Sequence, residues 1–470
     1  MSFASLPPRI SAALALGLMA GCATVPPPAP PPAISAETNA ANFDARSFQS
    51  EGLRRFLAEN AGSSLPPEAD FETLSWVGFY FHPSLELARA QWATARAVER
   101  SVSVRPNPTL TLTPGYNFTR VPGVSPWMPG INLDFLFPTA GKRGQQQAIA
   151  RRDAEAARLA MVSTVWQLRS ELRRSLAETA SASRREALLH AQIEVQQKLL
   201  ALLEQRFAAG GATAPDVSLQ RTALLRAESA AAEAAGQSGA ARTRVAAALG
   251  LPLSALDKVS LPLAPSGFSM APAALAAARR ESLQSRADVL AALAKYHAAQ
   301  SALELEIAKR TPDLHLGPGY QWDQGSNKWT LGFSFELPLF HRNEAPIAEA
   351  LARRAEAAAQ FNLTQSQALA AIDSAVAAQG AAAAQLTRAK QLRAEIEKQS
   401  TRVQQQLELG NADQVQVQTA RLDLLTVETA VADAENAATV AAGQLEDALQ
   451  IPFPQLAALV DSAPANPRTP

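Results

Sequence analysis

Residues 309–342 carry the sequence KRTPDLHLGPGYQWDQGSNKWTLGFSFELPLFHR, which predicts two β-strands joined by a short polar turn at 323–327. Apolar and polar residues alternate over nine positions of the second strand, a period typical of a strand with one apolar and one wet face. The apolar face of that strand carries Trp329, Leu331, Phe333, Phe335 and Leu337. The first strand alternates in the same way, and the DQGSN turn has the composition of a hairpin connection.

A second copy of this hairpin lies about 200 residues earlier in the chain. RPNPTLTLTPGYNF at 105–118 matches TPDLHLGPGYQW, and INLDFLFP at 131–138 matches LGFSFELP. Leu133 and Phe135 fall on the apolar face of the earlier copy. The sequence therefore predicts four strands, at about 107–119, 129–138, 312–322 and 328–338.

Four strands are too few to close a barrel, for which roughly eight are needed. An open four-stranded sheet with an apolar face would expose unpaired edges and a large apolar patch. We therefore expect several copies of the chain each to contribute four strands to one shared barrel.

Long helices account for much of the remaining chain, which is rich in Ala, Gln, Arg and Glu. We expect helices at about 145–208, 215–249, 343–409 and 413–449, long enough to indicate antiparallel coiled coils. Gly210 and Gly410 interrupt the helical runs of the two halves of the chain at equivalent positions. The chain is thus an internal repeat, with a first repeat over 46–265, a second over 266–455 and a flexible tail over 456–470. Shorter helices are expected around 45–59, over 83–103 and over 272–310.

The N-terminus has the pattern of an exported protein. Residues 1–21 predict a signal peptide, and LMAGC at 18–22 resembles a bacterial lipobox in which Cys22 is lipidated. The alternative is an ordinary signal peptide cleaved near an incidental cysteine. VPPPAPPPA at 25–33 predicts an extended polyproline segment, within a Pro-rich, lipid-anchored tether over 22–45.

Composition argues against several classes of function. The net charge is zero, so no nucleic-acid partner is indicated. Cys22 is the single cysteine, and the five histidines are scattered without metal-ligand spacing, so we expect no metal site. No nucleophile–base constellation and no phosphate-binding loop is present, and we expect neither catalytic residues nor a cofactor.

The ordered duplicate pattern resembles the TolC family of outer-membrane efflux channels. The motifs that carry the resemblance are PNPTLTL, the helices PSLELARA and SRADVLAALA, the tips QRFAAGGATAPDVSLQ and QLELGNADQVQVQ, and ELPLFHRNEA at 336–345. ELPLFHRNEA and the GKR at 141–143 are similar to the subgroup that works with heavy-metal and cation exporters. The likeness spans about residues 75–455.

The resemblance implies a mainly α fold with a β-barrel part, in which a homotrimer completes a 12-stranded barrel above a periplasmic α-barrel. It implies a lipid-anchored protein of the cell outer membrane that extends into the periplasm. Its partners would be an inner-membrane efflux pump, a periplasmic adaptor and outer-membrane lipid. The barrel residues expected to face lipid are Trp329, Leu331, Phe333, Phe335, Leu133 and Phe135. Thr109, Thr111, Asn132, Asp134, His315, Gln321, Ser334 and Glu336 would face the lumen.

The resemblance also places a periplasmic gate at the helix tips, with candidate residues Gly210, Asp216, Gly410, Asp413 and Gln416. Relatives place an acidic pair in the second tip, whereas this chain has Gln416 and Thr419 there. Asp216 is therefore either part of a selectivity ring or only a charge that favours the start of a helix. The predicted function is passive export of metal ions, other cations or drugs. The alternatives are type I protein secretion, a periplasmic adaptor and a structural coiled-coil lipoprotein.

Overall fold

The computed structural model describes residues 35–60, 70–119, 122–257, 259–262, 270 and 272–451. The chain separates into two compact units, residues 1–45 and 46–470. Helix α2 (Ala36–Asp44) belongs to the first unit and lies within the predicted tether. The signal peptide 1–21, Cys22, the repeat boundary at 265 and the tail 456–470 lie outside the described residues.

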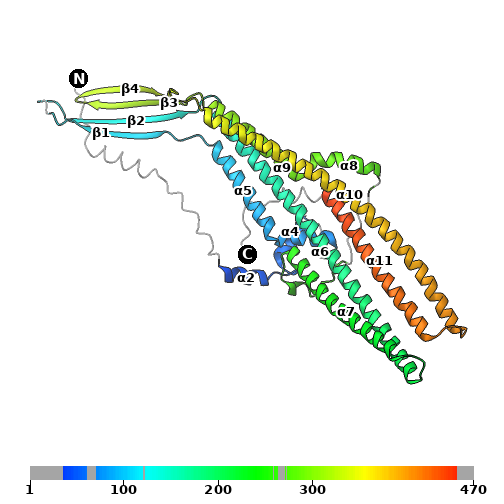
Figure 1. Cartoon of the computed structure of the whole chain (residues 1–470). Coiled ribbons are helices and arrows are strands. Elements are labelled where there is room, and N and C mark those ends of the chain that lie inside the picture. The colour runs from blue at the N-terminus through cyan, green and yellow to red at the C-terminus, as the bar shows by residue number, and fades with distance from the viewer. Residues whose placement is uncertain are drawn as a thin grey trace. The chain divides into compact units, whose positions relative to one another are not determined.

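Two long helical hairpins dominate the second unit (Figure 1). They are formed by α6 (Lys142–Ala208) with α7 (Ala214–Leu249), and by α10 (Glu344–Glu408) with α11 (Gln414–Leu449). The predicted bounds of all four helices agree with these to within three residues. Gly380 does not interrupt α10, because a single glycine costs a long helix only about 1 kcal/mol.

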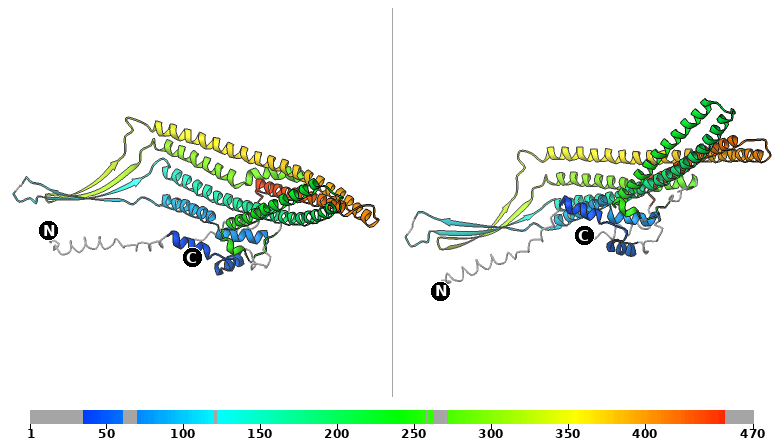
Figure 2. Two further views of the ribbon diagram at one scale, coloured as in Figure 1. Left: turned by 60° about the horizontal axis from the view of Figure 1, so that its bottom comes forward. Right: turned by 90° about the horizontal axis from the view of Figure 1, so that it is seen from below.

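Shorter helices surround these hairpins: α3 (Glu51–Asn60), α4 (Phe71–Phe81), α5 (Pro83–Ser103), the 3-10 turn η1 (Leu253–Leu256), α8 (Pro272–Ser285) and α9 (Ala287–Ala308). The α5, α6, α9 and α10 helices pack in that order, and α6 also packs against α11. Figure 2 shows the sheet at one end of these helices and the two hairpin tips at the other. None of the helices in the described part of the chain is apolar over a stretch long enough to cross a bilayer.

The main core lies partway along α6, where α3, α4 and the end of α7 pack around it. Leu57, Leu74, Leu172 and Leu249 are fully or almost fully buried there. The sequence of α4, FETLSWVGFYF, is apolar on nearly all sides, as expected of a helix enclosed by others. The helix expected around 45–59 corresponds to α3, which begins later than expected, at Glu51, and ends at Asn60.

The four strands form one antiparallel sheet in the order β1 (Thr109–Tyr116), β2 (Trp127–Phe137), β3 (Leu314–Asp323) and β4 (Ser326–Ser334). Each repeat supplies one hairpin, and β2 pairs with β3 to join the two. The predicted five-residue turn is in fact two residues, Gln324 and Gly325, both with positive φ. Such a turn matches the twist of the strands it joins, so pairing continues to Asp323 and Ser326.

The prediction that the fourth strand runs to 338 is wrong. β4 ends at Ser334, which pairs with His315 near the start of β3. Phe335, Glu336 and Leu337 therefore lie beyond the paired strand, and Pro338 has no amide hydrogen to continue a ladder. Their assignment to barrel faces does not follow from pairing within one chain.

Candidate functional site

The register of the sheet gathers the apolar residues of all four strands on one face. Leu112 lies opposite Ile131, Ile131 opposite Tyr320, and Tyr320 opposite Trp329. Since directly opposite residues point to the same side, the alternation seen in each strand extends across the whole sheet. The predicted lipid-facing residues Leu133, Phe135, Leu331, Phe333 and Trp329 all belong to this apolar face.

This apolar face is exposed in the single chain. Trp329 is 80% exposed, Phe333 63% and Leu331 59%. Near the turn end of the sheet, two cross-strand aromatic pairs lie on the same face, Tyr116 with Trp127 and Tyr320 with Trp329, with ring centroids 5.0 and 4.8 Å apart. Such a surface is suited to a hydrocarbon environment with an aromatic border.

The opposite face of the sheet is polar. Asp134 and His315 hydrogen-bond across the β2–β3 junction, with 2.8 Å between Oδ2 and Nδ1. Gly317 and Gly319 leave room there for the side chain of Asn132, because a Cβ on Gly319 would lie 3.1 Å from Asn132 Oδ1. The predicted lumen residues within the strands share this face, whereas Glu336 lies beyond β4.

The two edges of the sheet, β1 and β4, pair with no further strand in the described part of the chain. The unpaired backbone N–H and C=O groups of an edge strand form a template with which a strand of another chain can pair. An exposed apolar face and two open edges together indicate that the sheet is one part of a larger wall.

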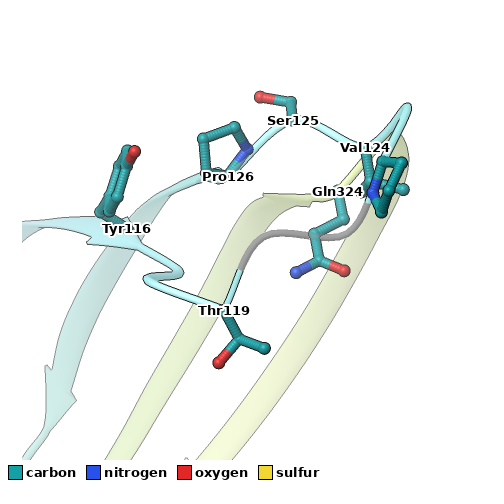
Figure 3. Close-up of a pocket in the computed structure, with 7 residues that line it drawn as sticks. Tyr116, Thr119, Val124, Ser125, Pro126 and Gln324 are labelled. Atoms are coloured by element: carbon teal, nitrogen blue, oxygen red, sulfur yellow. The ribbon is translucent and has the colours of Figure 1, made fainter.

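At the turn end, the loop after β1 and the turn after β3 lie beside each other (Figure 3). They enclose an open pocket of about 410 Å³ lined by Tyr116, Pro126 and Gln324 among others. The described residues of its lining carry hydroxyl and amide groups.

The first helix tip turns at Gly210, whose φ of +75° favours glycine. Thr213 then caps α7 reciprocally with Asp216: the Asp216 amide donates to Thr213 Oγ1, and the Thr213 amide donates to the Asp216 carboxylate at 3.0 Å. Hydrogen bonds from the Thr213 hydroxyl and amide lower the pKa of Asp216 below its usual value. Asp216 thus has the helix-start role that the sequence left as one of two possibilities.

The second tip repeats this geometry with exchanged residues. Gly410 also has a φ of +75°, and Asp413 caps α11 while the Gln416 side chain accepts from the Asp413 amide at 3.0 Å. Asp413 has an additional partner, since Arg206 of α6 donates to its Oδ2 at 2.7 Å. The hydrogen bond from Arg206, followed by that from the Gln416 amide, lowers the pKa of Asp413.

The structure therefore brings the two tips together through Arg206 and Asp413, a contact that the sequence analysis missed. The partners are 207 residues apart. The internal repeat does place both residues near a tip glycine, but nothing in one sequence indicates that the two tips touch. The described residues contain no group of three or more His, Cys, Asp or Glu side chains that could hold a metal ion.

Comparison with known proteins agrees with this architecture. The family model for outer membrane efflux proteins matches residues 81–251 and 278–449, one match for each repeat. None of the curated proteins matches the chain.

Among solved structures, the outer membrane protein VceC of Vibrio cholerae has a TM-score of 0.67 at 23% identity, covering 81% of this chain and 95% of VceC. A membrane protein of Pseudomonas aeruginosa has a TM-score of 0.67 at 20% identity, covering 81% and 90%. CusC, described as forming a transmembrane channel, has a TM-score of 0.66 at 19% identity, covering 81% and 91%.

Proposed function

Since this chain belongs to the outer membrane efflux protein family, we propose that three copies of it form a passive conduit from the periplasm to the exterior. The four-stranded sheet, with an exposed apolar face and two open edges, is the observation that carries the proposal. Three sheets of four strands give a 12-stranded wall, which lies within the known range for membrane barrels. The lipid-facing residues would be those of the apolar face, and the Asp134–His315 face would line the water-filled lumen.

The proposal predicts a trimer that conducts ions. The full chain, purified in detergent, should have the mass of three copies by light scattering and should give discrete conductance steps in a planar bilayer. A monomer that keeps Trp329 and Phe333 out of detergent contact, or a trimer that never conducts, would overturn it. A periplasmic adaptor would give no conductance in the same assay.

The helix tips are the proposed gate. Arg206 and Asp413 connect the end of α6 to the start of α11, so separating the two tips must break this ion pair. Asp216 carries a second carboxylate in the first turn of α7, at the position that Gln416 occupies in α11. In a trimer these groups would recur three times around the periplasmic end, where rings of carboxylates set cation selectivity.

Asp216→Asn tests the role of charge at the tip, because the amide keeps an oxygen that can accept the Thr213 hydrogen bonds. If the Asp216 carboxylate contributes to selectivity, the variant should show a lower preference for cations in reversal-potential measurements across a salt gradient. Unchanged conductance and ion preference would leave Asp216 with its capping role alone. Asp216→Glu, which retains the charge, is the matched control.

Energy for export would come from an inner-membrane pump, linked to the tips directly or through a periplasmic adaptor. The exported substrate would be a metal ion, another cation or a drug, with ELPLFHRNEA as the motif that favours cations. Lipidation of Cys22 would add a second attachment to the outer membrane. Metabolic labelling with palmitate, which Cys22→Ser should abolish, tests the lipid anchor; equal labelling of the variant would reject it.

A further inference from the structure

Resting on the proposed trimer, we propose that residues 335–342 of one copy, here called the post-β4 segment, dock into a groove beside α5 of the next copy. The groove lies between α5 and α6, beneath the end of β2. The interaction would seal the junction between the strands and the helices at each contact between copies. Its occupant is thus a specific segment of an identical chain.

The junction between the two repeats within one chain supplies the template. There the residues that follow β2 contact those that precede β3. The Thr139 amide donates to Asp313 Oδ1 at 3.0 Å, its hydroxyl donates to the Pro312 carbonyl at 2.6 Å, and Lys142 Nζ donates to Asp313 Oδ1 at 2.7 Å. If β4 of one copy pairs with β1 of the next, the post-β4 segment meets the residues that precede β1 in the same way.

The repeat changes the chemistry of that second junction from polar to apolar. Aligning Pro138 with Pro338 places Leu339 at the position of Thr139 and Phe340 at that of Ala140. Within the single chain, Leu339 is 77% exposed and Phe340 99%. Side chains of this kind are usually covered in the working protein, so their exposure indicates a missing partner.

A groove with one apolar and one charged side lies where the partner is needed. Its volume is about 880 Å³, and it is lined on the apolar side by Val98, Val102, Val104, Leu136 and Ile149. Val104 belongs to the connection between α5 and β1 and is itself 71% exposed. The Arg143 side chain closes one side by donating to the Ser103 carbonyl.

The helix arrangement points to the same neighbour. The α9 helix precedes β3 and lies between α6 and α10, whereas α5, its counterpart before β1, packs along α6 on one side. Among the described elements, no long helix lies along the other side of α5. By the repeat, the missing helix is α10 of another copy, and the post-β4 segment leads directly into α10.

Disulfide cross-linking in the full-length trimer tests the docking. Phe340→Cys combined with Val104→Cys should give disulfide-linked dimers and trimers on a denaturing gel after mild oxidation. Each single variant reports any background from Cys22, the sole native cysteine. Phe340→Cys combined with Leu219→Cys is the matched control, because Leu219 is also exposed (72%) but lies in α7 near the first tip.

The mass and conductance of the same preparation separate this inference from the proposed function. Conducting trimers that cross-link no better than the Phe340–Leu219 control would overturn the docking and leave the channel intact. Absence of trimers would overturn both. A fluorophore on Phe340→Cys that is quenched by lipids with brominated acyl chains would show that lipid, rather than a second copy, covers the segment.

Discussion

Asp413 combines two roles in one carboxylate. Its Oδ1 accepts from the Gln416 amide at 2.9 Å and so caps α11, while its Oδ2 accepts from Arg206 at 2.7 Å. Since these partners lower its pKa in the folded protein, the ionised group stabilises the tip at neutral pH. That contribution is fully present above the ordinary pKa of aspartate and is lost as the pH falls through the lower, folded value.

The two roles of Asp413 can be separated by substitution. Asp413→Ala removes both, and should cost the first turn of α11 about 1 kcal/mol from the lost cap. Asp413→Asn retains a capping oxygen and should lose only the ion pair, which is half-exposed and worth less than about 1 kcal/mol. Hydrogen exchange of the amides from 414 to 417 at pH 7 should therefore be fastest in Asp413→Ala. Equal exchange rates in both variants would contradict this assignment, and exchange in α7 serves as the internal control.

At the scale of elements, a charged cluster fastens α11 to α6. Arg173 is 6% exposed and contacts Asp447 at 2.8 Å and Glu446 at 2.9 Å, and it donates to the Gly443 carbonyl. Gly443 permits this approach, because a Cβ there would lie 2.6 Å from Arg173 Cδ. Burial raises the pKa of Asp447, and Arg173 opposes that shift. The C-terminal end of α11 is thus held against α6, far from the hairpin tip at the N-terminal end of α11.

Arg173→Met should destabilise the protein by about 3 kcal/mol, because it leaves the largely covered Asp447 carboxylate (21% exposed) without its counter-charge, whereas Glu446 keeps Arg169 at 3.6 Å. Without Arg173 the pKa of Asp447 rises further, so the folded variant takes up a proton more readily than the unfolded chain. The loss of free energy of unfolding in Arg173→Met, relative to the unsubstituted protein, should therefore become smaller as the pH is lowered from 7 to 5. Thermal unfolding followed by circular dichroism at both pH values measures this.

Arg184→Met is the matched control for that experiment. It removes an ion pair to Glu435 between the same two helices, but with both side chains more than a third exposed. Its cost should stay below about 1 kcal/mol and change little with pH. A comparable loss of stability in the two variants would mean that burial does not decide the strength of the α6–α11 contact.

The sequence predicted these elements unequally, for physical reasons. The four long helices follow from runs with no proline beyond their first turn and with glycine at the hairpin tips, which are local properties. The α4 helix was missed because WVGFYF is apolar on all sides and shows no periodicity. The end of β4 was missed because alternation continues through Phe335 and Leu337, whereas pairing depends on how far β3 extends. The Arg206–Asp413 and Arg173–Asp447 contacts depend on packing between repeats, which no local pattern encodes.

For the whole molecule, the decisive property is the difference between the two faces of the sheet. Neighbouring residues of β4 point to opposite sides: Thr330 lies opposite Gly319 on the polar face, and Leu331 lies opposite Pro318 on the apolar face. In the proposed trimer the first faces water in the lumen and the second faces hydrocarbon. One strand thus supplies a matched pair of positions for the same substitution.

Leu331→Lys should impair assembly, since a lysine facing lipid near the bilayer midplane costs about 2–4 kcal/mol in each copy. Thr330→Lys should assemble normally, because its side chain projects into the lumen where Gly319 opposite leaves space. It should shift the channel towards anions, since three positive charges would be added around the pore. The fraction of chain recovered as trimer from reconstituted vesicles and the reversal potential in a salt gradient measure the two effects. Normal assembly of Leu331→Lys together with failure of Thr330→Lys would place lipid on the polar face and reverse the orientation of the wall.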